Sequence, residues 1–314
     1  MKYIVKKLIM MAFTILVISF VVFLAFRFIP GDPALMILGG QSSPEKIEAL
    51  RQEMGLNDPV MAQYLRWLGG LLRGDFGVSY RYSMPVLSLI GEKIPITLFL
   101  TLEAFLLMVV ISIPLGIYTA KYSGGLIDRV LVVINQIIMA VPPFFSGILI
   151  TWLFGMTFRW FRPGGYISYK VSFASFLGYL FYPALAIALP KAAMAVKLLR
   201  SSVLTEAKLD YVRTAYSRGN ATNDVLYRHV LKNAIIPVVT FLGMTLADMV
   251  AGSLIVEQVF GIPGLSKTLL TSISNRDYPV VEAIIVLIAV IVVTSNVAVD
   301  LIYRALDPRI RAEE

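Results

Sequence analysis

The chain contains no cysteine, and His229 is the only histidine among its 314 residues. The absence of cysteine excludes a disulfide framework and a thiolate metal site. A lone histidine has no second histidine or cysteine with which to build a metal or nucleophile constellation, so we expect it to pack or to hydrogen-bond locally. The sequence therefore predicts no catalytic site, no metal site and no bound cofactor.

A phosphate-binding loop is also missing, although the stretch "GIPGLSKT" at 261–268 comes close to one. Ser266 stands where the pattern requires its second glycine, and no parallel strand is expected before it. We therefore expect no nucleotide to bind at this stretch.

Charge is scarce as well, since charged residues make up 15% of the chain and hydrophobic residues 58%. The mean hydropathy of +0.78 is well above that of a soluble domain. A bilayer crossing needs about 20 apolar helical residues. Six largely uncharged runs meet this requirement: residues 8–26, 94–120, 130–158, about 171–189 with an extension towards Arg200, about 235–256, and 283–299. The sequence predicts an all-α, polytopic membrane protein with six transmembrane helices.

Two features inside these runs are candidates for lining a translocation pathway. Pro142 and Pro143 are expected to bend the third run, which either shapes a cavity or is a passive kink. Asp248 lies near the middle of the fifth run, where it must face protein or a water-filled cavity. Pathway lining and a structural hydrogen bond are equally consistent with it. Asp300 and Arg304, one helical turn apart, are expected to pair at the inner interface.

Basic residues indicate the topology. They concentrate at the N-terminus, after residue 120, between 197 and 232, and in the C-terminal tail, which favours both termini in the cytoplasm. The net charge of +8 then reflects topology and contact with anionic membrane lipid rather than a nucleic-acid partner. The first run is too long for a signal peptide and no cleavage site follows, so we interpret it as a retained helix.

The segment between the first two runs carries its own helix signals. Ser43 is a candidate N-cap before Pro44, and Gly55 ends that helix. A second helix is predicted over Val60–Leu72, and Pro85 begins a third. We predict an N-terminal transmembrane helix at 1–28, an extracytoplasmic helical cap at 29–95, a transmembrane core at 96–305 with a cytoplasmic loop at about 200–234, and a cytoplasmic tail at 306–314.

One polar stretch, "RTAYSRGNATNDVLYRHVLKNAIIP" at 213–237, interrupts the hydrophobic C-terminal half. Residues 208–217 have helical composition, Gly219 supplies a stop, and Thr222 is expected to cap a second short helix. Its charged face is larger than lipid head groups require. The alternatives are a solvated loop with ordinary positive-inside charge and a docking surface for a cytoplasmic partner.

This stretch resembles the cytoplasmic loop of ABC-importer permeases, whose pattern is Glu-Ala-Ala, three residues, Gly, nine residues, Ile, one residue, Leu-Pro. Ala215, Gly219 and Leu231 match it. Arg213, Thr214, His229 and Lys232 depart from it in the manner of the dipeptide, oligopeptide and nickel branch. Six further stretches resemble the same branch: "PGDP" at 30–33, "GLNDP" from 55, "GDFGVS" at 74–79, "FGIPGL" at 260–265, "RDYPVV" at 276–281 and "VDLIYRALDPRIR" at 299–311.

The resemblance implies a type I ABC importer permease fold in the bacterial inner membrane, with the cap between helices 1 and 2. It also implies a coupling helix that sits in a groove of an ATP-binding subunit. The residues assigned to this coupling loop are Arg213, Thr214, Ala215, Gly219, Ala221, His229 and Leu231. The implied partners are a second homologous permease, two ABC ATPases and an extracytoplasmic solute-binding protein.

Peptides are the solute that the resemblance favours, moved by alternating access, and nickel or another metal chelate is the alternative. An alternative from another class is an ion-gradient-driven transporter in which Asp248 and its neighbours relay protons or cations. A third alternative is a membrane receptor or scaffold.

Overall fold

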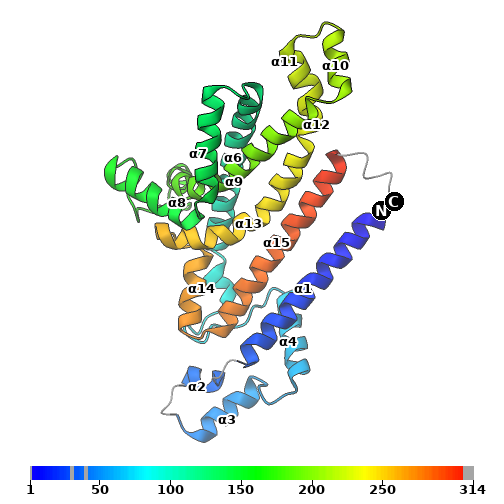
Figure 1. The fold of residues 1–314 in the computed structure, drawn as a ribbon. Coiled ribbons are helices and arrows are strands. Elements are labelled where there is room, and N and C mark those ends of the chain that lie inside the picture. Colours follow the sequence, from blue (N-terminus) through cyan, green and yellow to red (C-terminus); the bar gives the residue numbers. More distant parts are fainter. Residues whose placement is uncertain (1, 29–31, 39–41, 307–314) are drawn as a thin grey trace. The chain divides into compact units, whose positions relative to one another are not determined.

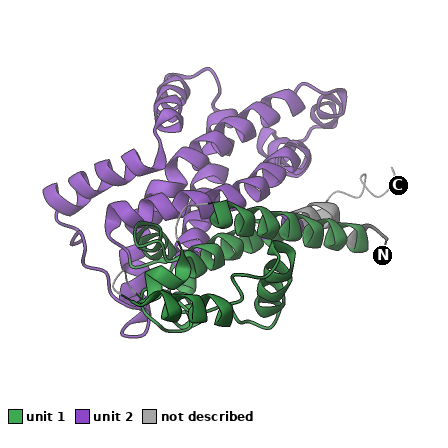
Figure 2. Ribbon diagram, turned by 90° about the horizontal axis from the view of Figure 1, so that it is seen from below, with its two compact units in different colours: residues 1–96, 263–294 green, residues 97–262, 295–314 purple. Residues whose placement is uncertain are grey.

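The computed structural model describes residues 2–28, 32–38 and 42–306, and over these ranges the chain is helical. The only extended pairing within them is an isolated bridge between Val78 and Pro85. The chain divides into two compact units, residues 1–96 with 263–294 (unit 1) and residues 97–262 with 295–314 (unit 2), which Figure 2 distinguishes by colour. The predicted all-α class is confirmed.

Within the described residues, five helices are long and apolar enough to cross a membrane, and the number rises to six if a bent helix pair forms one span. Figure 1 shows how these helices follow one another along the chain. The five are α1 (Lys2–Phe28), α6 (Ile94–Lys121), α9 (Phe173–Glu206), α13 (Ile236–Phe260) and α15 (Tyr278–Leu306). Each contains one of the predicted runs. The fourth run does continue past Lys191, because α9 extends as one helix to Glu206.

The sixth candidate crossing is the bent pair. Helix α7 (Leu126–Ala140) ends before the two prolines, and α8 (Pro143–Ile150) starts at the second and leads into the π-helix η1 (Thr151–Thr157). The two parts meet at 108°. Val141 and Pro142 are extended, and proline has no N–H to continue the helical hydrogen bonds, so the predicted bend is confirmed and is a sharp corner.

Unit 1 carries the short helices of the segment between α1 and α6. They are α2 (Pro33–Leu38), α3 (Pro44–Glu53), α4 (Val60–Leu72) and α5 (Val86–Ile90), with α14 (Leu265–Ser274) from later in the chain. The predicted bounds of α4 are confirmed, and Gly55 follows the end of α3 as predicted, with a left-handed φ of +63°. Ser43 occupies the N-cap position of α3, as predicted, and its side chain makes no capping hydrogen bond.

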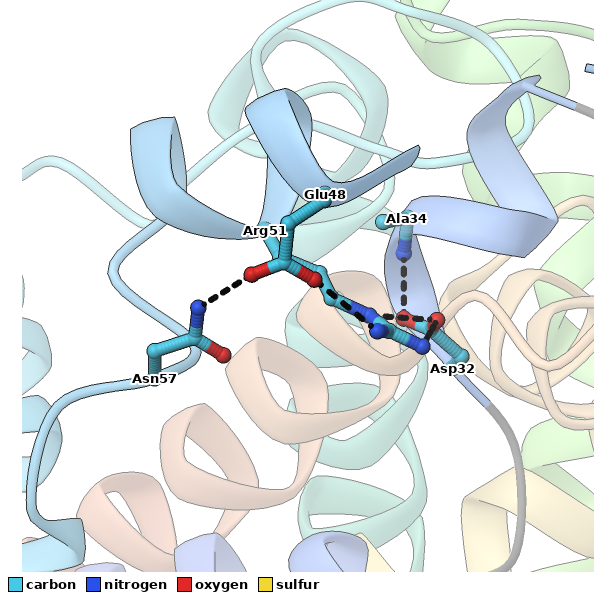
Figure 3. A network of polar contacts seen from close by, with 5 residues as sticks. All are labelled: Asp32, Ala34, Glu48, Arg51 and Asn57. Atoms are coloured by element: carbon cyan, nitrogen blue, oxygen red, sulfur yellow. Dashed lines mark hydrogen bonds and ion pairs between the residues drawn. The ribbon is translucent and has the colours of Figure 1, made fainter. Parts of the chain in front are cut away.

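Polar contacts hold α2 against α3 (Figure 3). The Arg51 guanidinium donates to Asp32 Oδ2 through Nε at 2.9 Å and Nη2 at 2.5 Å, and to Glu48 Oε2 at 3.1 Å. The backbone N–H of Ala34 donates to Asp32 Oδ1 at 3.0 Å. Burial works to raise the pKa of Asp32, but the bonds from Arg51 and Ala34 outweigh it and hold that pKa below its ordinary value.

Helix α9 is central in unit 2, where α7, α8 and α13 all pack against it. Small side chains permit the close approach, since Ala184, Ala188 and Ala192 of α9 are almost completely buried. Gly147 of α8 also permits close packing, because a Cβ atom there would lie only 3.1 Å from the Phe260 ring. This core carries the loop that follows α9.

Candidate coupling site

The segment 207–235 between α9 and α13, which we term the 207–235 loop, folds into short helices instead of a disordered connection (Figure 1). Its elements are α10 (Asp210–Ser217), α11 (Thr222–Asp224), the π-helix η2 (Val225–Val230) and α12 (Leu231–Ala234). The sequence predicted two helices around Gly219, and both are present. The π-helix was not predicted, because its wider hydrogen-bond pattern leaves no distinct periodicity in six residues.

A small apolar core holds α10 against η2. Val212 and Ala215 of α10 are buried, as are Val225, Leu226 and Val230 of η2. The five side chains occupy the inner positions of the two elements, so the charged residues between them face outward. The loop is therefore a packed unit with an exposed polar face.

The turn between the two helices depends on Gly219. Its φ of +84° lies in the left-handed region that disfavours residues with a Cβ atom. Asn220 stabilises the turn by donating from Nδ2 to the carbonyl oxygen of Ala215 at 3.0 Å. The predicted cap at Thr222 is wrong, because Ala221 occupies the N-cap position and Thr222 is the first helical residue.

Tyr211 ties this loop to the end of α9. Its hydroxyl donates to Glu206 Oε1 at 2.7 Å and accepts from Asn233 Nδ2 at 3.1 Å. Burial, followed by the hydrogen bond to Glu206, raises the pKa of Tyr211. The sequence analysis missed these three residues, because a single tyrosine next to a charged stretch carries no signal of its distant partners.

The predicted coupling residues occupy two kinds of position. Arg213, Thr214, Ala221 and His229 are exposed, while Ala215 is buried and Leu231 half-buried. The guanidinium of Arg213 lies 3.4 Å from Asp210 Oδ1, and both side chains are largely in solvent, so this pair adds little stability. The imidazole of His229 is on the surface, and its carbonyl oxygen is 3.4 Å from the Tyr211 hydroxyl.

Asp248 is paired within unit 2. Lys191 Nζ of α9 lies 3.1 Å from Asp248 Oδ2 of α13, and 68% of the aspartate side chain is exposed on the isolated chain. The sequence did not predict that these two residues pair, because their contact depends on how the two helices are rotated. The pair lies far along both helices from their ends, where an ionisable group is costly unless it is partnered or hydrated.

A second ion pair, which the sequence did not indicate, fixes the start of α7 to α9. Arg200 donates through Nε and Nη2 to the two carboxylate oxygens of Asp128, at 3.0 and 2.8 Å. The backbone N–H of Gly124 donates to the same carboxylate at 2.9 Å. Asp128 is only 3% exposed, so this is a buried bidentate pair near the end of α9 that leads into the 207–235 loop.

The two prolines and the remaining charged groups complete the comparison with the sequence. Pro142 and Pro143 form the corner between α7 and α8 described above. Glu257 is fully buried and accepts a hydrogen bond from Thr97 Oγ1 at 2.5 Å. The expected pair of Asp300 and Arg304 lies outside the described side chains.

Comparison with known proteins supports a single assignment. Residues 112–312 match the family described as binding-protein-dependent transport system inner membrane component, and residues 1–101 match the N-terminal family of the same transport systems.

Individual relatives align over almost their full length. A probable peptide ABC transporter permease protein of Sinorhizobium fredii is 34% identical over 98% of this chain and 99% of its own. The oligopeptide transport system permease protein AppB of Bacillus subtilis is 36% identical over 98% of each chain. The glutathione transport system permease protein GsiC of Escherichia coli is 32% identical over 99% of each. The chain belongs to the family of binding-protein-dependent transport system inner membrane components, the permease subunits of ABC importers.

Proposed function

We propose that this permease subunit forms half of a translocation pathway for short peptides and works by alternating access. The observation that carries the proposal is the near full-length similarity to permeases named for peptide, oligopeptide and glutathione transport. The shared chemistry of those solutes is a peptide backbone with charged ends. The nickel-chelate alternative gains no support from these names, and the family favours an ATP-driven importer over an ion-gradient-driven transporter.

The 207–235 loop is the proposed coupling element, and an ATPase subunit is its proposed partner. Its buried core and the bonds of Tyr211 make it a stiff block, which transmits a displacement better than a coil does. Arg213, Thr214, Ala221 and His229 would supply the contact surface, since all four are exposed. Ala215, Gly219 and Leu231 would maintain the shape of the block.

The route for displacement leads from the block into α9. The bonds between Tyr211 and Glu206 join the block to the end of that helix, and Arg200 joins the same helix to α7 through Asp128. Closure of two ATPases would therefore move α9 and α7 together. The corner at Pro142 and Pro143 and the Lys191–Asp248 pair are the proposed pathway-lining features.

The proposed assembly contains a second homologous permease, two ABC ATPases that hydrolyse ATP, and an extracytoplasmic solute-binding protein. Both termini and the 207–235 loop would face the cytoplasm, which agrees with the concentration of basic residues there. The proposed regions are the N-terminal helix at 1–28, the outer cap at 29–95, the core at 96–305 and the tail at 306–314.

Uptake by the reconstituted assembly tests the proposal. Proteoliposomes containing this chain and its partner subunits should accumulate radiolabelled dipeptide in the presence of ATP and the binding protein, and should accumulate nickel complexes far less. ATP-dependent uptake of nickel complexes without peptide uptake would contradict the solute assignment. Uptake by this chain alone, driven by an ion gradient, would contradict the mechanism.

A further inference from the structure

Unit 1 contains a cavity of about 630 Å³ that the proposed transport mechanism does not use. This volume is within the range of small-molecule binding sites, roughly 300–1,000 Å³. All of its lining residues belong to unit 1, and they come from the end of α1, from α2, the end of α3, α4, the segment 76–83 and the start of α15. It is therefore a feature of one compact unit of this chain.

Three of the sequence stretches that carry the family resemblance meet at this cavity. Pro33 comes from the stretch at 30–33, Phe76 to Ser79 from the stretch at 74–79, and Tyr278 and Pro279 from the stretch at 276–281. Nothing in the coupling mechanism explains why these stretches are placed together. Their shared position indicates that they build one site.

Hydrogen bonds fix the wall that the second and third stretches form. The Ser79 hydroxyl donates to Asp277 Oδ2, and the backbone N–H of Tyr80 donates to Asp277 Oδ1 at 2.9 Å. Asp277 is fully buried, and the backbone N–H of Val86 closes the segment on the carbonyl oxygen of Gly77 at 2.9 Å. The wall is thus preorganised.

Aromatic rings make up much of the lining, and charged groups of both signs accompany them. The six aromatic residues are Phe23, Phe26, Trp67, Phe76, Tyr80 and Tyr278. Ring faces attract cations, as the position of the Arg27 guanidinium 4.9 Å from the centre of the Phe23 ring illustrates. Arg27 itself lines the cavity together with the carboxylates of Glu53 and Glu282.

One buried polar group at the cavity lacks a hydrogen-bond partner in the part of the chain that the structure describes. The hydroxyl of Tyr278 is buried without a hydrogen-bond partner, although the residue is only 8% exposed. Glu282 is 9% exposed, and the positive charge of Arg27, which lines the same cavity, acts on its carboxylate. Burial, followed by the charge of Glu282, raises the pKa of Tyr80.

We propose that this cavity binds a small zwitterionic molecule. Glu282 accepts hydrogen bonds from its ammonium group, Arg27 donates to its anionic group, and the aromatic rings cover its apolar part. Two sources share this chemistry: a short peptide with free termini, and the head group of phosphatidylethanolamine. The inference goes beyond transport and does not require the transported solute to be a peptide, because the lipid head group would satisfy the same groups.

A fluorescent label in the cavity measures this binding. Val78 lines the cavity and is 54% exposed, and the chain has no cysteine, so Val78→Cys gives a single labelling position. The assembled transporter, with cysteine-free partner subunits, is labelled with bimane and placed in phosphatidylglycerol nanodiscs. The dipeptide Ala-Phe, its N-acetyl form and its C-terminal amide are then titrated, and separate nanodiscs contain phosphatidylethanolamine.

Ala-Phe or phosphatidylethanolamine should shift the bimane emission, and Glu282→Gln should weaken the binding that this shift measures at least tenfold. N-acetylation of the dipeptide should have the same effect as Glu282→Gln. Arg27→Gln should weaken binding of Ala-Phe much more than binding of its amide. Glu103→Gln is the matched control, since Glu103 is another membrane-embedded glutamate with a buried, unpartnered oxygen, and it belongs to unit 2.

The arms of the experiment separate the two sources. A Glu282-dependent response to the dipeptide identifies a peptide site, and a Glu282-dependent response to phosphatidylethanolamine alone identifies a lipid site. The proposal is overturned when neither amine source shifts the label, or when the shift is unchanged in both Glu282→Gln and Arg27→Gln. Peptide uptake is measured in the same assemblies, so uptake without cavity binding overturns this inference and leaves the transport function standing.

Discussion

The guanidinium of Arg200 binds both carboxylate oxygens of Asp128, at 3.0 and 2.8 Å, and thereby joins α9 to the start of α7. Because Asp128 is buried, removal of the cation leaves an uncompensated charge in the interior. Arg200→Ala should therefore lower the free energy of unfolding by about 3 kcal/mol. Thermal unfolding of the detergent-solubilised assembly, followed by scanning fluorimetry, measures the effect.

Arg66→Ala is the matched control for this substitution. Arg66 also pairs with an aspartate, Asp58, but both side chains are exposed to solvent, so its loss should leave the unfolding temperature almost unchanged. The unfolding temperature of Arg200→Lys should lie between those of the wild type and Arg200→Ala, since lysine keeps the charge but cannot bind both oxygens in parallel. Equal unfolding temperatures for Arg200→Ala and Arg66→Ala would show that the buried pair does not stabilise unit 2.

Tyr211→Phe should weaken the link between the 207–235 loop and α9. The substitution removes the hydroxyl that donates to Glu206 and accepts from Asn233, while the ring remains in place. Two hydrogen bonds of about 1 kcal/mol each would be lost. We expect ATP hydrolysis by the assembly to continue while peptide uptake per ATP falls severalfold. Both rates are measured in the same proteoliposomes.

Tyr82→Phe is the control for Tyr211→Phe, since Tyr82 is exposed in unit 1 and far from this loop in the chain. It should retain the wild-type ratio of uptake to hydrolysis. A wild-type ratio in Tyr211→Phe would mean that these bonds do not carry the coupling.

Gly219→Ala should disturb the turn of the 207–235 loop through the backbone alone. Gly219 has φ +84°, and a Cβ atom there would meet no atom within 4 Å, so the cost is conformational and about 1 kcal/mol. We expect reduced uptake with normal amounts of protein in the membrane. Gly219→Asn should retain more uptake, because asparagine tolerates the left-handed conformation better.

Gly69→Ala provides the contrast. Gly69 lies within α4, and a Cβ atom there also has open space, but its backbone is helical, so alanine should be neutral or slightly stabilising. Uptake that falls equally in Gly69→Ala and Gly219→Ala would contradict the role assigned to the turn.

The hydrogen-bond network around Asp32 predicts a specific response to acid. The pKa of Asp32 is lower in the folded protein than its ordinary 3.8, so the folded state binds the proton less readily than the unfolded state. The stability that this carboxylate contributes is therefore complete above the ordinary value and is lost as the pH falls through the folded value. The unfolding temperature of the wild type should decline more steeply below pH 4 than that of Asp32→Asn.

Glu45→Gln is the control for the acid response, since Glu45 is exposed in the first turn of α3. The unfolding temperature of Glu45→Gln should decline below pH 4 as steeply as that of the wild type. Identical pH profiles for the wild type and Asp32→Asn would contradict the predicted contribution of this network.

Local sequence signals predicted the elements that local physics determines. The apolar runs predicted the long helices, and the paired prolines at 142 and 143 predicted the corner. The left-handed glycines at 55 and 219 ended helices as expected, because few other residues adopt that conformation.

Contacts between distant segments were not predictable in this way. The partners of Arg200, Lys191 and Tyr211 lie far away in the chain or on separate helices, and which partner each reaches depends on helix rotation and packing. The cavity of unit 1 has the same origin, because it forms only where three separate stretches meet. The sequence marked those stretches as typical of the family without indicating that they are neighbours.

The central claim is that an ATPase subunit docks on the 207–235 loop, and a cross-link at Ala221 tests it most directly. Ala221 is exposed at the start of α11, and the chain contains no other cysteine, so Ala221→Cys places one thiol on the proposed contact surface. We predict that a short bifunctional reagent joins Ala221→Cys to the ATPase subunit in a transport-active assembly, and that Val78→Cys in unit 1 gives no such product. An active assembly in which Ala221→Cys is accessible to the reagent and never cross-links to the ATPase would contradict the account.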